Sequence, residues 1–575
     1  MEELPDRAAP PRMADYEREY ASFRLEVPDA FNPTIDIVEA WAGRSPEALA
    51  LVSLDGAGGV VAEQTTADLA RESRRAARAL AAAGIGKGDR VFVMLPRVPA
   101  WYAAVLGAIR IGAVVAPAPN MLTPRDIGYR VGTLGAVAAI TDAGGAERLD
   151  AAPEGTDSLR VKIAWHAGDR IGGGDVGTGA LDARESAFGA PDGWLDFDAL
   201  LDAAGDGETP ASPTSATDPM LIFFTSGTVS YPKMVQQPCA YGLGHVPTAR
   251  FWHDLRRGDR HWTVSDTGWA KAAWGGLFGQ WHEEATVVQV ALGKPDADTI
   301  LGIVSGADVT SFCAPPTLYR LLVQADLSSH DLSRLRHCTS AGEPLNPEVI
   351  RAWEEGVGLT VYDGYGQSET TLMVANYRCL PVRPGSMGRP VPGWDVDVFG
   401  EDGEAAPDDV VGNVGVRLGG GRPVGLFDEY LGDEEANAAA FRDGNYYSGD
   451  KAWRDGDGYL WFEGRDDDVI TSAAYRIGPF EVESALVEHD AVVEAAVVGR
   501  ADPERTQIVT AFVVLAAGRE GGDDLAAELQ SHTRELTAPY KYPREVHFVE
   551  ELPKTISGKI RRSQLREELA AGKFD

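Results

Sequence analysis

Lysine is rare in this chain of 575 residues. It occurs at ten positions, and arginine carries most of the positive charge. Aspartate and glutamate outnumber lysine and arginine by 87 to 53, which gives a formal net charge of −34. A surface of that sign repels nucleic acid and anionic membranes, so we expect neither as a partner. A polyanionic substrate would therefore need a locally basic site.

Cysteine and long apolar runs are also scarce. The four cysteines form no Cys-x-x-Cys pair and no metal-ligand spacing, which indicates thiols in a reducing compartment. The best apolar candidate, residues 103–119, is interrupted by Arg110 and is shorter than the roughly 20 residues that span a bilayer. The acidic N-terminus lacks the apolar segment of a signal peptide. We therefore expect a cytoplasmic protein with no membrane insertion.

The length predicts at least two domains, because a single core does not grow to this size. Helical patterns at 32–48, 68–83 and 101–112 alternate with strand patterns at 49–54, 90–95 and 113–118, which predicts an α/β fold with a parallel sheet. An acidic run at 464–468 predicts a boundary between residues 1–465 and 466–575. In the second part, strands at 492–498 and 509–515 and a helix at 523–536 predict a compact α+β domain.

Residues 221–233 read Leu-Ile-Phe-Phe-Thr-Ser-Gly-Thr-Val-Ser-Tyr-Pro-Lys. The apolar start predicts a short buried strand. Small residues after it let backbone N–H groups close around an anion, hydroxyls add donors, and Lys233 adds a mobile charge. The stretch therefore favours a polyphosphate. The spacing differs from the Walker motif, and a surface turn is the alternative that this stretch alone leaves open.

Two other glycine-bearing patterns are predicted to be structural. The Gly172-x-Gly174-x-x-Gly177 sequence is followed by no helical pattern, so a surface loop is favoured over a dinucleotide site. The acidic stretch 455–458 lacks the later ligands of a calcium-binding loop and stands between two strand patterns. It is predicted to be a hairpin turn.

Two tryptophans surround one lysine in residues 265–274, at Trp269, Lys271 and Trp274. This arrangement predicts an apolar pocket for an organic acid, with a cation at its polar end. A core turn with a partly buried lysine is the alternative. At the other end of the chain, a basic cluster at 554–562 is conspicuous in so acidic a protein, and we expect it to meet phosphate.

The stretch 225–233 resembles the phosphate loop of the adenylate-forming superfamily, which includes acyl-CoA synthetases, adenylation domains of peptide synthetases and beetle luciferases. At least six motifs follow one another in family order between about residues 32 and 562. Residues 265–281 are most similar to medium-chain acyl-CoA synthetases. The chain departs from the family pattern at Val229, Ser230 and Ala474.

The resemblance implies a large N-terminal domain of layered α/β sheets plus a small β-barrel, followed by a small, mobile α+β C-terminal domain. It also implies a set of residues that bind ATP or AMP: Thr225, Ser226, Gly227, Thr228, Lys233, Gly342, Glu343, Pro344, Asp363, Gly364, Tyr365, Gly366, Gln367, Ser368, Asp450, Arg465 and Arg476. Within this set, Tyr365 would stack on adenine and Asp450 would bind the ribose.

Catalytic and substrate-binding roles are implied in the same way. Glu369 and Thr228 would hold Mg²⁺, and Lys559 would act with Lys233, Thr228 and Glu369 in adenylate formation. Trp269, Lys271 and Trp274 would bind the acyl group. CoA would contact Ala474, Tyr475 and Lys541, and Asp467 would be the hinge. An amino-acid substrate is not expected, because Ala270 and Lys271 stand where amino-acid-activating relatives place an aspartate.

The sequence is therefore interpreted as an acyl-CoA synthetase that uses ATP, Mg²⁺ and CoA on a small-to-medium-chain carboxylic acid. Two alternatives stay open. One is an adenylating enzyme that loads a carrier-protein thiol in trans. The other is a nucleotide-binding pseudoenzyme, suggested by Val229, Ser230 and Ala474. Homo-oligomerisation is a further open expectation.

Overall fold

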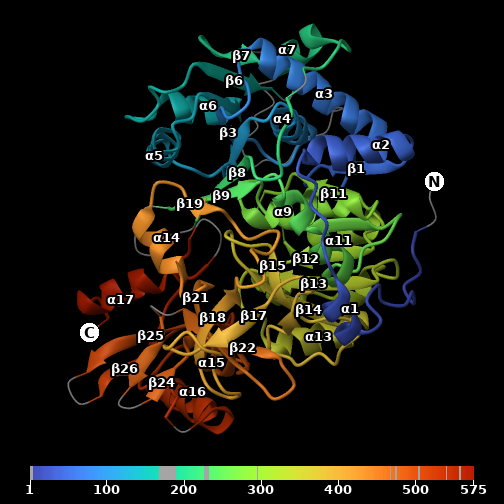
Figure 1. Ribbon diagram of the computed structural model, residues 1–575. Helices are drawn as coiled ribbons and strands as arrows, with labels where there is room; N and C mark the ends of the chain where they lie inside the picture. The colour runs from blue at the N-terminus through green and yellow to red at the C-terminus, as the bar shows by residue number, and fades with distance from the viewer. Residues whose placement is uncertain are drawn as a thin grey trace.

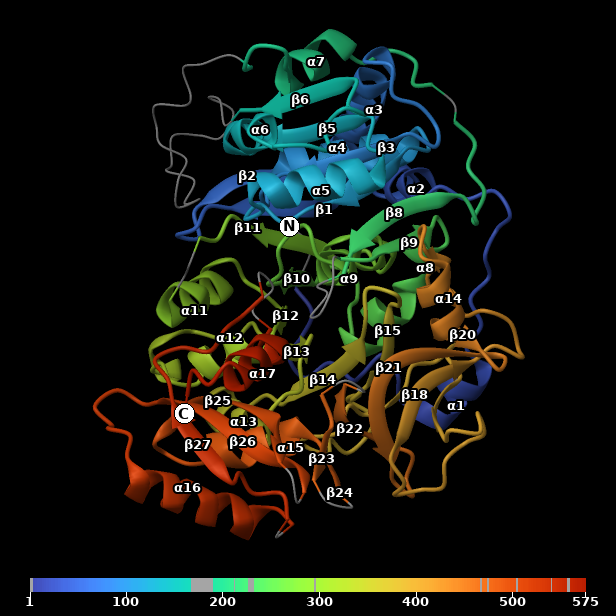
Figure 2. The ribbon, with the colours of Figure 1, turned by 90° about the vertical axis from the view of Figure 1, so that its left-hand side faces the viewer.

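The computed structural model describes residues 4–166, 190–210, 212–225, 232–293, 296–465, 468–472, 475–502, 505–538, 540–555 and 559–574 (Figures 1 and 2). Several positions discussed above lie outside these ranges: Gly172–Gly177, Ser226, Gly227, Thr228, Val229, Ser230, Asp467 and Ala474. The predicted boundary at 465/466 also falls at such a position and stays a prediction.

An eight-stranded sheet, in the order β19-β9-β8-β4-β3-β5-β6-β7, forms one end of the molecule (Figure 1). Its six strands from β8 to β7 are parallel, β9 runs antiparallel to β8, and β19 runs antiparallel to β9. The strands are β3 (Arg90–Met94), β4 (Val114–Pro117), β5 (Ala138–Asp142), β6 (Val161–Trp165), β7 (Leu195–Asp196), β8 (Pro219–Phe224), β9 (Met234–Pro238) and β19 (Glu429–Tyr430).

Both faces of this sheet are covered by helices, which is why its strands read as continuous apolar runs. Val91 and Val93 of β3 join the core that α4 shares, whereas Phe92 and Met94 join the core beneath α5 and α6. The helices are α3 (Thr66–Ala82), α4 (Pro99–Arg110), α5 (Pro124–Leu134), α6 (Ala143–Asp150) and α7 (Phe197–Ala204). A capping box between Thr65 and Asp68 starts α3, two residues before the predicted start.

A nine-stranded sheet, in the order β16-β15-β14-β13-β12-β10-β11-β1-β2, follows below it (Figure 2). Its strands are β1 (Leu49–Leu54), β2 (Val60–Thr65), β10 (Arg260–Thr263), β11 (Thr286–Val290), β12 (Ser311–Ala314), β13 (His337–Ala341), β14 (Val361–Gly366), β15 (Leu372–Ala375) and β16 (Arg389–Pro390). The bounds of β1 were predicted correctly. However, β1 pairs with β11 and β2 and not with β3, so the three predicted N-terminal strands do not share one sheet.

The two faces of this sheet differ in polarity. Trp262, Phe312 and Cys338 lie side by side in the register and face an apolar core with α11 (Ala297–Gly306), α12 (Pro316–Leu322) and α13 (Pro347–Val357). The neighbouring rows belong to the opposite face and are polar, with His261 beside Ser311 and Thr263 beside Cys313. Such a polar row is unusual in a buried parallel sheet.

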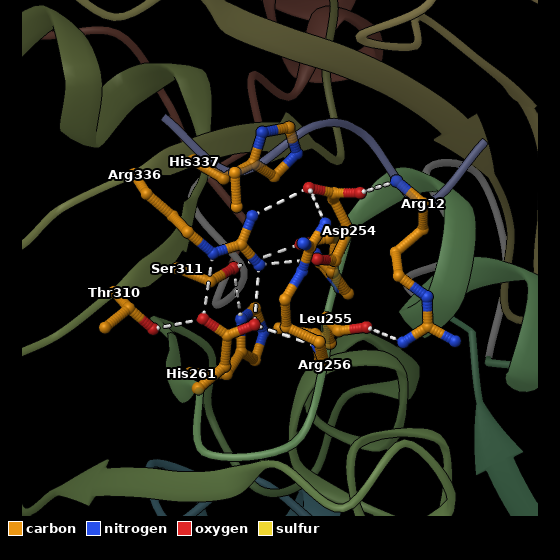
Figure 3. Close-up of polar contacts among 12 residues, drawn as sticks. Arg12, Asp254, Leu255, Arg256, His261, Thr310, Ser311, Arg336 and His337 are labelled. Carbon is orange, nitrogen blue, oxygen red and sulfur yellow. Dashed lines mark hydrogen bonds and ion pairs between the residues drawn. The ribbon is translucent and has the colours of Figure 1, made fainter. Parts of the chain in front are cut away.

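A buried ionic cluster lies at the start of β13 (Figure 3). Arg336 is fully buried and joins Asp254, at 2.7 Å, to Asp259, at 2.6 Å. Thr310 donates a further hydrogen bond of 2.7 Å to Asp259. The N-terminal segment closes over this cluster, because the backbone N–H of Arg12 donates to Asp254 at 2.6 Å.

The N-terminal segment then runs along the outside of the nine-stranded sheet (Figure 1). Its helix α1 (Tyr16–Ser22) is held by Tyr16, whose hydroxyl donates to the carbonyl of Pro390 at 2.8 Å. The helical pattern predicted at 32–48 is realised as a π-helical turn, η1 (Thr34–Glu39), followed by α2 (Ala40–Arg44).

Two short helical segments, α8 (Tyr241–Gly244) and η3 (Thr248–Trp252), lie between β9 and β10 and connect the two large sheets. Within the nine-stranded sheet, α9 (Ala270–Gly276) and α10 (Gly279–His282) lie between β10 and β11, and η4 (Leu327–Ser329) precedes β13. A five-stranded antiparallel sheet forms the curled, barrel-like unit that was predicted, with β17 (Val396–Phe399), β18 (Gly412–Arg417), β20 (Phe441–Arg442), β21 (Asn445–Arg454) and β22 (Leu460–Arg465). Residues 455–458 form the turn between β21 and β22, as predicted. Helix α14 (Glu434–Ala440) precedes this hairpin.

The C-terminal sheet lies at the end of the molecule opposite α7 (Figures 1 and 2). It contains β23 (Ile470–Ser472), β24 (Tyr475–Ile477), β25 (Val492–Asp502), β26 (Thr506–Leu515) and β27 (Glu545–Phe548), with α15 (Pro479–Val487), α16 (Asp523–Leu536) and α17 (Arg562–Ala570). This is the predicted α+β unit, and the bounds of α16 were predicted correctly. Within the described part of the chain, no helix is long and apolar enough to cross a membrane. The four cysteines are free thiols.

Candidate active site

The base of the predicted phosphate loop is closed by one residue pair. The N–H of Thr225 donates to the carbonyl of Lys233 at 3.0 Å, and the N–H of Lys233 donates to the hydroxyl of Thr225 at 3.1 Å. Thr225 follows β8 and Lys233 precedes β9, and the two strands are antiparallel neighbours. Because the two strands are paired up to this point, Lys233 starts from a fixed backbone position.

One tyrosine joins Lys233 to Glu369. The ammonium of Lys233 lies 4.8 Å from the ring centroid of Tyr430, and the hydroxyl of Tyr430 donates to Oε1 of Glu369 at 2.8 Å. Burial raises the pKa of Glu369, and the Tyr430 hydroxyl opposes that shift. Tyr430 was not predicted from the sequence, because a single aromatic residue far from the loop belongs to no recognisable local pattern.

A second polar group surrounds Asp450 on β21. Oδ2 of Asp450 accepts hydrogen bonds from the hydroxyl of Tyr365 and from Nε2 of Gln367, the latter at 2.7 Å. Arg465 lies opposite on β22, with Nε 3.9 Å from Oδ1. Burial raises the pKa of Asp450, and the charge of Arg465 opposes this shift. Four residues predicted to bind the nucleotide thus meet here, from three strands and the turn after β14.

Lys271 points from α9 to the end of β13. Its ammonium donates to the carbonyl of Ala341 at 2.7 Å and lies next to Gly342, whose φ of +113° favours glycine. Burial lowers the pKa of Lys271, whereas the thiol of Cys313 and the carboxylates of Glu343 and Asp363 oppose that shift. Burial also raises the pKa of Asp363 well above its usual range. The Glu343 carboxylate in addition lies 3.6 Å from Arg320.

Two indole rings lie against the glycines of β14. A methyl group at Gly366 would stand 2.7 Å from the Trp274 ring, and one at Gly364 would stand 2.7 Å from the Trp252 ring. These glycines therefore permit close packing of two aromatic walls. Trp274 was predicted to bind the acyl group, but Trp252 and Cys313 were missed. The indole beside Gly364 comes from η3 and the thiol beside Lys271 comes from β12, both outside the predicted motif.

Trp269 caps the N-terminus of α9 and is partly exposed. A small apolar cavity lies behind it, lined also by Trp101, Phe223, Ala273 and Leu277. Ala273 and Leu277 are four residues apart and share one face of the helix, whereas Lys271 and Trp274 lie on the other. Trp269 therefore forms a cavity wall that is partly exposed to solvent.

Lys559 comes from the C-terminal part of the chain. It is exposed, and the hydroxyl of Thr555 accepts from its N–H at 3.1 Å. Its charge lowers the pKa of Lys271 in addition to burial, and it opposes the effect of burial on Asp450. Arg562, three residues on, anchors this segment through a 2.7 Å ion pair with Glu483. The charge of Lys559 thus acts on Lys271 and on Asp450, the residues predicted to bind the acid and the ribose.

Other predicted residues are placed differently. Lys541 forms an ion pair with Glu481 of α15, which raises its pKa against the effect of burial. Tyr475 and Arg476 belong to β24, of which the backbone alone is described. Pro344 directly follows Glu343, and the carbonyl of Ser368 accepts from Gln237 at 2.8 Å.

Glu369 fits a magnesium ion that is held mainly by phosphate oxygens. Among the described residues, no group of three or more His, Cys, Asp or Glu side chains could hold a metal by itself. Mg²⁺ in nucleotide sites commonly needs only one or two carboxylates besides phosphates and water. A single partly buried carboxylate near the phosphate loop matches that donor set.

Comparison with known families decides the class of this chain. Residues 38–427 match the family model "AMP-binding enzyme", and residues 481–559 match "AMP-binding enzyme C-terminal domain". The chain belongs to the AMP-binding enzyme family. The resemblance to the adenylate-forming superfamily and the fold class that it implied are thereby confirmed, and the chain is an enzyme of this family.

The similarity to known relatives covers almost the full length of this AMP-binding enzyme. Acyl-coenzyme A synthetase ACSM3, mitochondrial, of Mus musculus is 39% identical over 568 residues, covering 97% of this chain and 94% of the relative. ACSM5, mitochondrial, of Homo sapiens is 41% identical over 552 residues, covering 94% and 91%. An acyl-CoA synthetase structure from Brucella canis is 34% identical, with a TM-score of 0.70 over 97% of this chain and 98% of that one. The anthranilate CoA ligase AuaEII, solved with anthranoyl-AMP, is 27% identical, with a TM-score of 0.82 over 95% and 99%.

Proposed function

We propose that this AMP-binding enzyme is an acyl-CoA synthetase that activates a small-to-medium-chain carboxylic acid. A carboxylate oxygen attacks the α-phosphorus of ATP, and the bond between the α- and β-phosphates breaks, giving acyl-AMP and pyrophosphate. The sulfur of CoA then attacks the acyl carbonyl, and AMP leaves as the thioester forms. The full-length similarity to acyl-CoA synthetases supports this reaction.

The observation that carries the proposal is that the charge of Lys559 acts on both Lys271 and Asp450, lowering the pKa of the lysine and opposing the effect of burial on the pKa of the aspartate. The three residues come from the C-terminal segment, from α9 and from β21. A cation whose charge acts on both the proposed acid-binding lysine and the proposed ribose-binding aspartate suits the charge that develops between carboxylate and α-phosphate. Electrostatic stabilisation of that kind is usually the largest contribution to such a step.

In this proposal, different residues bind the phosphates, the ribose and the adenine of ATP. Lys233 and Thr228 bind the β- and γ-phosphates, Asp450 and Arg465 bind the ribose, and Tyr365 stacks on adenine. The fixed backbone of Lys233 and the hydrogen bonds on Asp450 support this arrangement. Magnesium, held by Glu369 and the phosphates, would supply charge neutralisation as pyrophosphate leaves. Arg476 lies near the AMP phosphate.

The acid occupies the space between the indole walls and Lys271. Trp252 and Trp274 lie against the glycines of β14, so the pocket is apolar and narrow. Lys271 stands at its polar end, where it binds the carboxylate or holds the β13 terminus through the carbonyl of Ala341. An apolar pocket with one cation suits an unbranched aliphatic acid better than an amino acid, whose ammonium group would meet Lys271.

CoA enters after the C-terminal domain, residues 466–575, has rotated about Asp467. Ala474, Tyr475 and Lys541 then line its passage. Lys541 and Glu481 both belong to this domain and move together, so the phosphates of CoA would compete with Glu481 for the Lys541 ammonium. We further propose that the enzyme is cytoplasmic and forms homo-oligomers. A mitochondrial location is the alternative, because the names of the relatives include the word mitochondrial.

A panel of carboxylic acids tests this function. AMP release is measured with butyrate, hexanoate, octanoate and benzoate, each with and without CoA. AMP release that depends on CoA and on an aliphatic acid is expected. Transfer to a carrier protein instead of CoA would favour the carrier-loading alternative, and absence of pyrophosphate release with every acid would favour a pseudoenzyme.

A further inference from the structure

Tyr430 occupies the space between the positive charge of Lys233 and the negative charge of Glu369. Its ring face lies 4.8 Å from the ammonium, and its hydroxyl donates a 2.8 Å hydrogen bond to the carboxylate. The two contacts use different parts of the same side chain. The ring face is negative and attracts a cation, while the O–H group is a donor that suits an anion.

The backbone holds this ring in one place. Tyr430 lies opposite Val235 in the β19–β9 register, and Val235 is two residues after Lys233 in the chain. Its N–H donates to Asn437 at 2.7 Å, and its carbonyl accepts from the same amide at 2.8 Å. The ring also makes an edge contact with Phe427, whose N–H donates to the carbonyl of Glu369 at 2.8 Å. The cation, the spacer and the anion are thus fixed relative to one another.

Lys233 and Glu369 form no ion pair with each other in the part of the chain that the structure describes. A lysine and a glutamate that contact the same partly buried side chain attract each other, because the local dielectric is lower than that of water. A direct pair would leave the lysine less available to phosphate and the carboxylate less available to metal. Both groups would have to be separated again before binding, and that separation would weaken the binding of ATP.

We propose that Tyr430 is a positioning residue that keeps Lys233 and Glu369 apart and ready for magnesium-ATP. The ring holds the lysine on its face, and the hydroxyl orients the carboxylate toward the metal. The inference rests on the proposed ATP site but concerns binding, which precedes any chemistry.

Calorimetric titration of the full chain with ATP, with and without Mg²⁺, tests this proposal. Tyr430→Phe keeps the ring and removes the hydroxyl. We expect the gain in ATP affinity on adding Mg²⁺ to fall about tenfold, the usual scale of one hydrogen bond to a charged group, while the Mg²⁺-free affinity stays within about twofold. Equal losses in both titrations, or no loss in either, would overturn the role of the hydroxyl.

Removal of the ring tests its role as a spacer. In Tyr430→Leu the lysine and the glutamate can form an ion pair. We therefore expect the Mg²⁺-free affinity for ATP to fall about tenfold, in addition to the loss of the gain on adding Mg²⁺. Adding Glu369→Gln to that variant removes the carboxylate that captures the lysine and should restore Mg²⁺-free binding. A double variant that binds as weakly as Tyr430→Leu would show that the ring acts otherwise.

Tyr20→Phe is the matched control. Tyr20 is also partly buried, and its hydroxyl donates to the carbonyl of Trp394 at 3.0 Å, outside the candidate site. It should leave both affinities unchanged. If Tyr430→Leu does not fold, Tyr430→Phe with and without Glu369→Gln decides, because the hydroxyl should matter only when the carboxylate is present. A wild-type chain that binds ATP but forms no acyl-AMP would refute the proposed function and leave this test intact.

Discussion

Asp450 and Arg465 lie opposite each other in the β21–β22 register, with Nε of Arg465 3.9 Å from Oδ1 of Asp450. The other carboxylate oxygen accepts from Tyr365 and Gln367. Asp450 is therefore oriented from two sides before any nucleotide arrives. Preorganisation of this kind spares the binding energy that ordering a side chain would cost.

Asp450→Asn should raise the KM for ATP at least about tenfold, because an amide loses the charge-assisted hydrogen bonds to sugar hydroxyls and to Tyr365. The KM for the acid should change much less. Steady-state kinetics in each substrate measure the two effects. Asp457→Asn, in the exposed turn of the same hairpin, is the control and should change neither constant. An equal rise in both KM values would contradict a ribose-binding role.

Lys559→Ala should slow acyl-AMP formation by about 10²- to 10³-fold, the scale of losing one preorganised charge donor. Thioester formation from pre-made acyl-AMP should be much less affected, because the lysine would have rotated away in that step. ATP–pyrophosphate exchange and single-turnover thioester assays separate the two steps. Lys554→Ala is the control, since Lys554 belongs to the same basic cluster but pairs with Glu494 at 2.9 Å. Equal loss in both half-reactions would refute the assignment.

Trp269→Leu should shift the preference of the enzyme toward longer acids. The ring forms the partly exposed wall of the apolar cavity behind α9, so a smaller side chain opens that space to an acyl tail. Each additional buried methylene is worth about 0.8 kcal/mol, so kcat/KM for hexanoate relative to butyrate should rise about fourfold or more. Trp461→Leu, which removes a distant indole stacked on Trp453, controls for the loss of a tryptophan. An unchanged ratio would place the acyl tail elsewhere.

Arg336→Met should destabilise the fold by about 3–5 kcal/mol, because it leaves Asp254 and Asp259 as buried charges without their central partner. Denaturant unfolding measures the loss. Arg334→Met is the control, because Arg334 is exposed and its contact with Asp308 is 3.8 Å long. A loss below about 1 kcal/mol would mean that Arg378, which also contacts Asp254, compensates for the missing guanidinium.

Buried histidines predict that the fold loses stability in acid. Burial lowers the pKa of His245 and His261 to about 3 and of His337 to about 4, from an ordinary value of 6.5. Below pH 6.5 the unfolded chain takes up protons that the folded chain refuses, so stability falls as the pH falls toward about 4. Each histidine contributes up to about 1.4 kcal/mol per pH unit.

His261→Gln tests this pH dependence. Glutamine can keep hydrogen bonds to Ser311 and Thr263, which His261 contacts at 2.9 and 2.8 Å. Between pH 6.5 and 4.5 the free energy of unfolding should then decrease less steeply than in the wild type. The difference in slope should correspond to about one proton fewer taken up on unfolding. An unchanged slope would show that His261 does not titrate between the folded and unfolded states as described.

The sequence by itself determined much of the secondary structure and the family. The bounds of β1 and α16 and the turn at 455–458 were predicted because their local patterns agree with their surroundings. The positions of Lys233, Glu369, Asp450 and Lys559 also followed from motifs in a fixed order. Such motifs are local, since a loop that approaches phosphate needs small residues at adjacent positions.

Only the tertiary structure decided which residues complete the site. Tyr430 reaches Glu369 because β19 pairs with β9, and that pairing joins segments almost two hundred residues apart. Trp252 meets Gly364, and Cys313 lies beside Lys271, through the order of strands in the nine-stranded sheet. Tertiary structure likewise places β1 and β3 in different sheets. A sequence pattern fixes which side of a strand a residue occupies, but strand order is set by long-range packing, and that packing decides which side chains meet.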